Sequence, residues 1–442
     1  MSFSTFVTKL VEGKSFEDLN ESHPLGHELD READKHPEGF TGFVHSLGTW
    51  AKEHPDTILT VLHKLRPVLT IKQVSVVTSF DGVRDVLSKD HDFAVTYGPK
   101  MEMITDGAGF FLGMDDNTQG FTDRTNMQML FRRDDIERLI KPSITALCQA
   151  QLDKQGDSFN LVEDYLKPIP ALFAAEYFGL QPDKHQWLIK VTQTLFEYLF
   201  IDVVNDKDLA KEAKQAAAEL RQQLDIEIAN TSAGAGTVLG RGVKLHQAGV
   251  QGFDPVRLRN NVLGLLIGLV PTIAKSAAMA FDWATQDDTR EAAFYQAYEN
   301  RAAHPFQQYV RELTRLNPIN PGLFRKAARD TFVISGGSAH PIKKDTLVFV
   351  STYTAMRDAR FVKQPEQLMY NRAASDYLTY GFGLHACFGR YISDFHVAQL
   401  LESLLDKAHY QRLQGEAGNL MFSGVFPSQL MVKAKNNAGE EL

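Results

Sequence analysis

The sequence predicts a mainly α-helical protein with small β-sheets. Helical spacing of apolar residues dominates from Asp134 to about Ile228, and a second long helical pattern starts at Asp254. Strand-like runs are short by comparison. A length of 442 residues would allow two or three domains. However, no linker separates two self-sufficient halves, so we expect one domain over residues 1–442, in which residues 1–60 form an irregular N-terminal arm.

The first half of the chain predicts short strands followed by helices. Residues 68–77 are rich in β-branched side chains and predict one or two strands. Residues 80–87 have helical spacing, whereas residues 97–116 mix glycines with Met and Phe and cannot form a long regular helix. Residues 206–227 are polar almost all round, which is typical of a solvent-facing helix. We expect the glycine-rich segment 232–252 to be a loop.

The second half is organised around one long helix. Asp254 is a suitable N-cap, Pro255 fits the first turn, and the helical pattern continues to about Asp282. A helix of about 30 residues is about 45 Å long. Because its middle is apolar, we expect it to be central and buried. The other expected elements are a helix over residues 306–316, strands over residues 331–334 and 346–350, and a helix from about residue 390 to residue 407.

Composition excludes several classes of protein. The formal net charge of −8 leaves no long basic surface for nucleic acid. Two cysteines cannot build a disulfide framework. The first residues lack a basic and apolar leader, and the most apolar stretch, residues 262–273, is shorter than the roughly 20 residues of a membrane span. We therefore expect a soluble cytoplasmic protein with no membrane anchor and no nucleic-acid partner.

One cysteine stands among glycines in the segment from Tyr380 to Arg390. Three glycines flank Cys387, and glycine lets a large flat group approach the backbone. The cysteine comes just before a predicted helix, whose N-terminal N–H groups and dipole would lower the pKa of the thiol. Since a thiolate is a strong ligand for iron, Cys387 is the candidate metal ligand. Cys148 lies in a helical run, and we expect it to be a small core residue.

This segment resembles the cysteine loop of the cytochrome P-450 superfamily of haem-thiolate enzymes. The family pattern is Phe-x-x-Gly-x-(Arg/His)-x-Cys-x-Gly, and this chain has Tyr380, Gly383, His385, Cys387 and Gly389 at those places. The tyrosine is a departure that keeps an aromatic ring. The resemblance implies the cytochrome P-450 fold, with haem b (iron protoporphyrin IX) between the long central helix and the helix after the cysteine loop. It also implies that the Cys387 thiolate is the proximal ligand of the iron.

A second match lies upstream of the cysteine loop. The family has a Glu-x-x-Arg helix, and here Glu312 and Arg315 stand three residues apart, where they share one helix face. Alone, such a pair is usually a solvated surface feature, but its position before the cysteine loop gives it weight. The family completes the pair with a later arginine, and Arg372 stands at that place.

The resemblance also implies which residues bind the two haem propionates. Arg325 matches the arginine of the family that binds one propionate, and His385 would bind another propionate oxygen. Arg124 stands in the region where the family often has an arginine for the same purpose. Cationic donors suit these roles because they form charge-assisted hydrogen bonds with carboxylates.

The match weakens on the central helix, where the family carries (Ala/Gly)-Gly-x-(Asp/Glu)-Thr over the iron. Here the stretch runs from Gly268 to Thr272, with Pro271 in place of the acid. A proline inside a helix frees one carbonyl, and we expect a kink. The kink has either no chemical role or belongs to an altered oxygen site that uses Thr272 and water. We expect Lys275, nearly one turn further on, to reach the surface, although it could anchor a substrate carboxylate.

The resemblance places an apolar substrate pocket beside the irregular loop, a later helix and the central helix. Met and Phe at such spacing are more often plain core than pocket wall. The candidate pocket residues are Met101, Met103, Phe110, Phe111, Leu112, Met114, Phe196, Phe200, Leu265 and Gly268.

The resemblance implies a monooxygenase that inserts oxygen into an apolar, fatty-acid-like or terpenoid-like substrate. Such an enzyme uses dioxygen and electrons from a separate protein, here expected to be of the ferredoxin type, because the chain has no flavin or iron–sulfur motif. Two alternatives stay open. One is a peroxide-using peroxygenase or hydroperoxide isomerase, and the other is a haem sensor without turnover.

Overall fold

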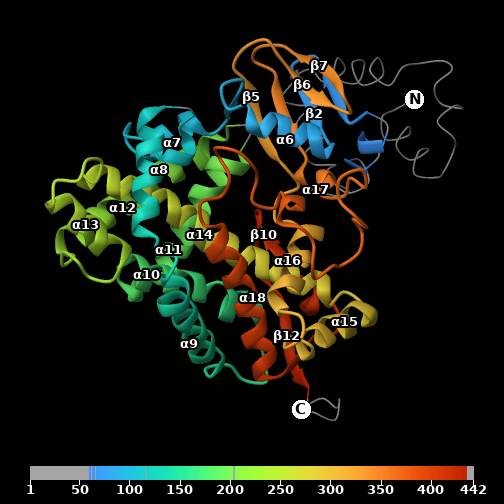
Figure 1. Cartoon of the computed structure of the whole chain (residues 1–442). Helices are drawn as coiled ribbons and strands as arrows, with labels where there is room; N and C mark the ends of the chain where they lie inside the picture. The colour runs from blue at the N-terminus through green and yellow to red at the C-terminus, as the bar shows by residue number, and fades with distance from the viewer. Residues whose placement is uncertain (1–58, 61, 65, 116, 203–204, 436–442) are drawn as a thin grey trace, which may run out of the picture. The chain divides into compact units, whose positions relative to one another are not determined.

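The computed structural model describes the chain as two compact units, each with its own hydrophobic core (Figure 1). The described residues are 59–60, 62–64, 66–115, 117–202 and 205–435. Unit 1 consists of the described residues up to Thr96, Asn320–Glu366 and Ala374–Ala386. Unit 2 consists of the described residues of Tyr97–Ile319, Gln367–Ala373 and Cys387–Leu442.

Unit 1 is built on a five-stranded sheet with the strand order β1-β2-β8-β5-β3. β2 and β8 are parallel, with Val74 opposite Leu347, and the other neighbouring strands are antiparallel. β6 and β7 form a separate hairpin. The elements of this unit are β1 Val68–Ile71, β2 Val74–Val77, α6 Phe80–Ser88, β3 Phe93–Val95, β5 Leu323–Ala327, β6 Thr331–Ser335, β7 Ser338–Ile342, β8 Leu347–Val350, α17 Thr352–Ala355 and η6 Ala374–Asp376.

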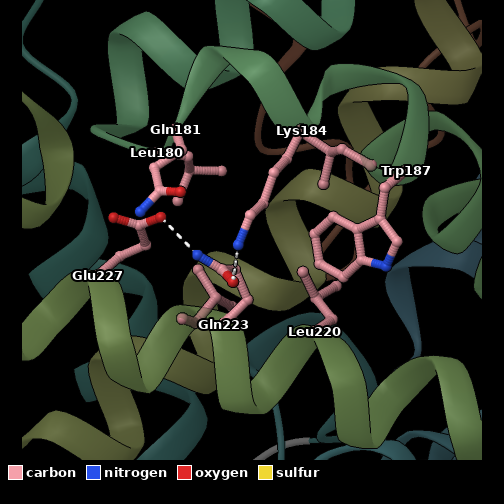
Figure 2. Close-up of a pocket in the computed structure, with 9 residues that line it drawn as sticks. Leu180, Gln181, Lys184, Trp187, Leu220, Gln223 and Glu227 are labelled. Atoms are coloured by element: carbon pink, nitrogen blue, oxygen red, sulfur yellow. Dashed lines mark hydrogen bonds between the residues drawn. The ribbon is translucent and has the colours of Figure 1, made fainter.

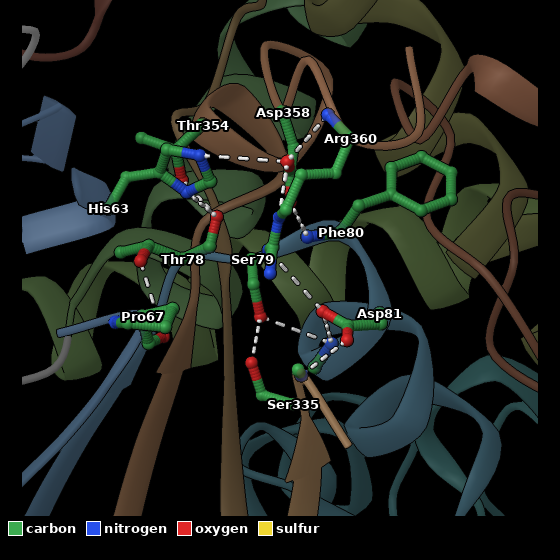
Figure 3. Close-up of polar contacts among 12 residues, drawn as sticks. His63, Pro67, Thr78, Ser79, Phe80, Asp81, Ser335, Thr354, Asp358 and Arg360 are labelled. Carbon is green, nitrogen blue, oxygen red and sulfur yellow. Dashed lines mark hydrogen bonds and ion pairs between the residues drawn. The ribbon is translucent and has the colours of Figure 1, made fainter. Parts of the chain in front are cut away.

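A buried carboxylate fixes the start of α6 in unit 1 (Figure 3). Asp358 accepts hydrogen bonds from the backbone N–H of Phe80 at 3.1 Å and from Arg360 Nε at 2.9 Å. Burial alone would raise the pKa of Asp358, but these hydrogen bonds outweigh it and the pKa is lowered. Beside them, the Ser79 and Ser335 hydroxyls lie 2.7 Å apart. Residues far apart in the sequence are therefore joined around the first turn of α6.

Unit 2 contains most of the helices, together with a three-stranded antiparallel sheet, β4-β12-β9, and the hairpin β10-β11. Its helices are α7 Gly98–Ile104, η1 Phe111–Gly113, α8 Thr118–Leu130, η2 Ile136–Ile140, α9 Lys141–Leu152, η3 Leu161–Leu166, α10 Pro168–Phe178, η4 Pro182–Lys184, α11 His185–Phe196, η5 Glu197–Ile201, α12 Lys207–Asn230, α13 Val238–Gln247, α14 Pro255–Ala284, α15 Asp288–Glu299, α16 Phe306–Leu316, α18 Arg390–Lys407 and η7 Glu416–Gly418. Its strands are β4 Ser158–Asn160, β9 His409–Arg412, β10 Met421–Ser423, β11 Phe426–Gln429 and β12 Met431–Lys435.

Helix α14 is the central element of unit 2. The Asp254 side chain accepts the backbone N–H of Arg257 at 3.1 Å, which is the N-cap that the sequence predicts. The helix contacts α10, α11, α12, α16 and α18, and Figure 1 shows α18 beside it. Among the described residues, it is the helix that is long and apolar enough to cross a membrane, but 72% of its apolar window is buried inside the structure. Such burial is typical of a core helix.

The structure confirms the main predicted helices. The patterns at residues 80–87, 254–282, 306–316 and 390–407 correspond to α6, α14, α16 and α18 with bounds that differ by at most two residues. The described residues of the segment 97–116 contain only the short helices α7 and η1, as expected. Cys148 is fully buried in the core of unit 2, also as expected. Most of the predicted N-terminal arm, residues 1–58, lies outside the described residues.

The prediction of a loop over residues 232–252 is wrong, because this segment contains helix α13. Thr237 caps the helix by accepting the backbone N–H of Gly240 at 3.1 Å. A Cβ atom on Gly242 would lie only 2.7 Å from side-chain carbons of Leu258, so this glycine permits close packing against α14. Gly242 therefore serves close packing, whereas Gly249 and Gly252 have positive φ values in the turns after the helix.

A buried carboxylate between two arginines holds α16 to the segment Gln367–Ala373 in unit 2. Glu312 accepts hydrogen bonds from Arg315 Nε at 2.8 Å and from Arg372 Nε at 3.1 Å, and all three side chains are at most 1% exposed. Both arginines also donate to the backbone carbonyl of Gln367, at 3.1 and 3.0 Å. The structure thus brings together the three residues that the resemblance pairs.

We expect Glu312→Gln to lower the free energy of unfolding by about 3–5 kcal/mol, because it leaves two buried guanidinium groups without their counter-ion. Urea unfolding followed by circular dichroism measures the change. The control is Asp134→Asn, whose pair with Arg138 is exposed on both sides (76% and 56%) and should contribute almost nothing. A loss at Glu312 as small as that of the control would contradict the role assigned to the cluster.

Candidate functional site

The cysteine loop presents Cys387 at the start of α18. The N-cap of this helix is Gly389, and its backbone N–H donates a hydrogen bond to the Cys387 sulfur. Cys387 keeps some accessible surface, unlike the fully buried Cys148. The sulfur atom is therefore placed where a helix N-terminus supplies an N–H group.

The expected low pKa of Cys387 is not found in the protein alone. Burial raises the pKa of the thiol, and the Gly389 N–H and the charge of Arg124 only partly oppose that rise. The sequence suggests the favourable helix dipole, but it does not show how closely protein atoms surround the sulfur. A metal ion would reverse the balance, because a coordinating thiol gives up its proton.

Aromatic rings and one arginine surround the loop within unit 2. Phe388 makes edge-to-face contacts with Phe111 and Phe131, at centroid distances of 5.2 and 5.3 Å. Arg124, on α8, lies 6.0 Å from the Phe388 ring, and burial lowers its pKa. Sequence analysis did not single out Phe131 or Phe388. Phe388 could have been predicted from its position next to Cys387. No motif in the sequence around Phe131 indicates a role for that residue.

The middle of α14 faces open space at one position. Gly268 is exposed although the residues just before it are buried, and a Cβ atom there would meet nothing within 4 Å. Thr272, one turn later, donates its hydroxyl hydrogen to the carbonyl oxygen of Gly268 at 2.5 Å. Pro271 is buried, and α14 continues through it without interruption. A flat group packed against α14 would require such an apolar surface with one position that carries no side chain.

The expectation that Lys275 reaches the surface is wrong. Its exposure is only 7%, and burial lowers its pKa to about 8. Helical periodicity shows which face of α14 the residue occupies, but not how thickly that face is covered.

The candidate pocket residues lie in unit 2 with different degrees of burial. Five of them belong to the hydrophobic core, namely Met101, Phe110, Phe111, Phe196 and Leu265. Three others pack against that core, namely Met103, Leu112 and Phe200. Phe110 lies against Gly264 of α14, whereas Phe111 contacts Phe388 of the cysteine loop. Among these candidates, Gly268 is the position that the structure leaves open.

The remaining predicted residues lie in unit 1. Arg325 is a buried residue of β5, opposite Val348 of β8, and donates to the Phe324 carbonyl at 2.8 Å. His385 is half-buried in the loop after Tyr380. Gly383 has a positive φ of 74°, and a Cβ atom there would lie 2.1 Å from the carbonyl oxygen of Leu87. Only glycine fits at this position of the family pattern.

A separate small cavity between α11 and α12 is too small to be the functional site (Figure 2). It encloses about 10 Å³, which is close to the volume needed for a single water molecule. Its wall is a chain of hydrogen bonds from Lys184 to Gln223 and from Gln223 to Glu227, each 2.6 Å long. A substrate or a cofactor cannot enter a space of this size.

The donor set of unit 2 fits a haem-thiolate centre. A cysteine sulfur, which is a soft ligand for iron, stands at the start of α18, and α14 packs against that helix. Gly268 leaves room on α14, and the charge of Arg124 acts on the sulfur. Cys387 would hold the iron, and Arg124 could pair with a carboxylate of the porphyrin.

Comparison with known proteins agrees with this arrangement. A sequence model of the family "Cytochrome P-450" matches residues 300–435. Cytochrome P-450 105A3 of Streptomyces carbophilus is 24% identical over 79% of this chain and 83% of its own length. Vitamin D3 dihydroxylase of Streptomyces griseolus is 23% identical over 77% of this chain and 82% of its own length. The crystal structure of the cytochrome P-450 enzyme CYP109B1 from Bacillus subtilis matches with a TM-score of 0.69 and 20% identity, over 86% of this chain and 99% of that chain. With the cysteine loop, the fold and these relatives in agreement, the chain belongs to the cytochrome P-450 superfamily of haem-thiolate monooxygenases.

Proposed function

We propose that this monooxygenase binds haem b through Cys387 and oxidises an apolar, fatty-acid-like or terpenoid-like small molecule with dioxygen. Its electrons would come from a separate ferredoxin-type protein, and it would act as a soluble cytoplasmic enzyme. The observation that carries the proposal is the position of Cys387, whose sulfur accepts the Gly389 N–H in the same unit that leaves Gly268 of α14 open. The apolar core around α14 supports an apolar substrate.

Each residue has a distinct task in this proposal. The Cys387 thiolate would hold the iron and donate electron density to it, and the haem, when bound, would supply the oxidising chemistry. The Gly389 N–H limits that donation by sharing the sulfur lone pair. Arg124, Arg325 and His385 would hold the propionates. Gly383 shapes the loop through its positive φ.

Thr272 and Pro271 set the proton supply on the distal side. The Thr272 hydroxyl donates to the Gly268 carbonyl, so it would have to turn away or act through a water molecule before it could give a proton into the open space beside Gly268. Pro271 has no N–H, which leaves the carbonyl of Ile267 without its helical partner and open to a water molecule. We propose that Thr272 and such a water replace the missing acid. A peroxide-using enzyme would not need either group, but the relatives that align over most of the chain include a hydroxylase.

Cys387→Ser should abolish the spectrum of thiolate-ligated haem, because the hydroxyl is a far weaker ligand for iron than a thiolate. The measurement is the carbon-monoxide difference spectrum of the reduced holoenzyme. Cys148→Ala, which changes a buried cysteine of the core, is the control and should keep that spectrum. A Cys387→Ser protein with an unaltered spectrum would remove the basis of the proposed function.

Thr272→Ala should lower product formation with dioxygen and a ferredoxin pair by roughly 10–100-fold, since general acid catalysis contributes this much or more. Hydrogen peroxide should accumulate instead, whereas turnover driven by added peroxide should change little. Thr272→Ser, which keeps the hydroxyl, is the matched control. Wild-type turnover with peroxide alone would identify the peroxide-using alternative, and no product under either condition would identify a sensor.

Gly268→Ala and Gly264→Ala test whether the open space on α14 lies where we place it. An added Cβ meets nothing at position 268, so Gly268→Ala should stabilise the helix by about 0.5–1 kcal/mol but weaken substrate binding. At position 264 the Cβ would lie 2.5 Å from the Phe110 ring, and the cost should be about 1–3 kcal/mol. Urea unfolding and substrate-induced spin shifts measure the two effects. Equal destabilisation by both variants would show that no such space exists.

A further inference from the structure

Lys275 is a buried cation in an otherwise apolar stretch of helix. Between Val262 and Phe281 it is the only charged residue of the sequence. The residue is only 7% exposed, and among the described residues it forms no hydrogen bond or ion pair. A pKa of about 8 keeps the amine protonated at neutral pH. A buried ammonium group without a partner is unfavourable, so a function for it must be sought.

The nearest influence on this amine inside the chain is Glu197, at the start of η5. Its negative charge raises the pKa of Lys275 against the larger effect of burial, but the two groups do not form an ion pair. The Glu197 carboxylate lies instead at the turn between β10 and β11, where a Cβ atom on Gly424 would be 3.2 Å from its Oε2 atom. Glu197 therefore acts on Lys275 through its charge rather than through a hydrogen bond.

Lys275 occupies the same face of α14 as the open position. The seven residues from Gly268 to Lys275 turn the helix by about 700°, which is only about 20° short of two full turns. The rise over this distance is about 10 Å. Because side chains on a helix lean toward its N-terminus, the amine points back toward Thr272 and Gly268 rather than away from them.

We propose that Lys275 binds the carboxylate of the substrate, so that the enzyme prefers long-chain apolar acids over neutral molecules of the same shape. This inference rests on the proposed function. The ammonium group would donate charge-assisted hydrogen bonds to the carboxylate, and the hydrocarbon chain would extend over Gly268. The backbone of Lys275 lies about 10 Å beyond that of Gly268 along the helix, and a head group fixed to its side chain would hold the hydrocarbon chain in one register over Gly268.

The test is a spin-shift titration of the ferric holoenzyme with dodecanoate and with dodecanol, which differ only in the head group. We expect the wild type to bind dodecanoate roughly 10-fold more tightly, as a hydrogen bond to a charged group provides. Lys275→Met should lose this preference while its affinity for dodecanol stays the same. Lys275→Arg should keep most of the preference, because it keeps the charge. Oxidation of dodecanoate by Lys275→Met should also spread over more carbon positions.

Raising the pH gives a second readout on the unmodified protein. Lys275 is protonated below its pKa of about 8, so the preference for dodecanoate should be complete at pH 6.5–7 and fall as the pH rises through about 8. Glu197 is the described charged group whose field acts on the amine. Lys275→Arg should keep its preference to higher pH, since arginine does not titrate there.

The outcomes separate this inference from the proposed function. A wild type that binds both ligands equally, or a Lys275→Met protein that keeps the preference for dodecanoate, would overturn the role of Lys275 while haem binding and turnover stay intact. A protein without a thiolate spectrum, or without a spin shift for any ligand, would overturn the proposed function itself. Methionine removes the cost of a buried charge, so Lys275→Met is expected to fold. If it does not, the comparison of Lys275→Arg with the wild type across pH decides the question.

Discussion

The buried carboxylate of Glu312 is the constraint that holds the chain in position just before the cysteine loop. The chain leaves unit 1 after Glu366, enters unit 2 for Gln367–Ala373, and returns to unit 1 until Ala386. Arg372 Nε and the Met369 N–H donate hydrogen bonds to the Glu312 carboxylate, and these bonds hold the seven-residue segment in place. Because the bonds are buried and bidentate, they fix the path of the chain shortly before the cysteine loop begins.

In the cysteine loop, the helix N-terminus and burial have opposite effects on the pKa of the Cys387 thiol. Gly389 supplies an N–H group to the Cys387 sulfur and Arg124 supplies a positive charge, and both favour the thiolate. Burial among protein atoms has the larger effect, so the unligated thiol stays protonated more readily than a free cysteine. A metal that took the place of the proton would reverse this balance, because a coordinating thiol is deprotonated. Burial that disfavours a bare thiolate also shields an iron–sulfur bond from water.

Local signals in the sequence predicted the elements that carry their own caps and periodicity. Asp254 and Pro255 marked the start of α14, and the spacing of glycines around Cys387 marked the cysteine loop. The sequence could not show that Gly242 packs against Leu258, because a glycine needed for contact looks the same as one needed for flexibility. The burial of Lys275 was missed for a similar reason, since the cover comes from other elements of unit 2. Strand partners such as β5 and β8 also depend on pairing between distant segments.

Helix α14 lacks the acid of the family and carries the cation Lys275, and both differences affect which substrates the site can bind. The stretch from Gly268 to Lys275 contains no acid, and Lys275 adds a cation, so α14 offers a net positive charge where the family has a negative one. In an apolar interior such a charge acts over a longer distance than in water. A neutral substrate would leave the ammonium group of Lys275 without compensation in every bound state, whereas an acid compensates it and gains affinity. If Lys275 binds the substrate as proposed, the helix that lacks the acid of the family carries an anion-binding group instead, and α14 then determines both the proton supply and the charge of the preferred substrate.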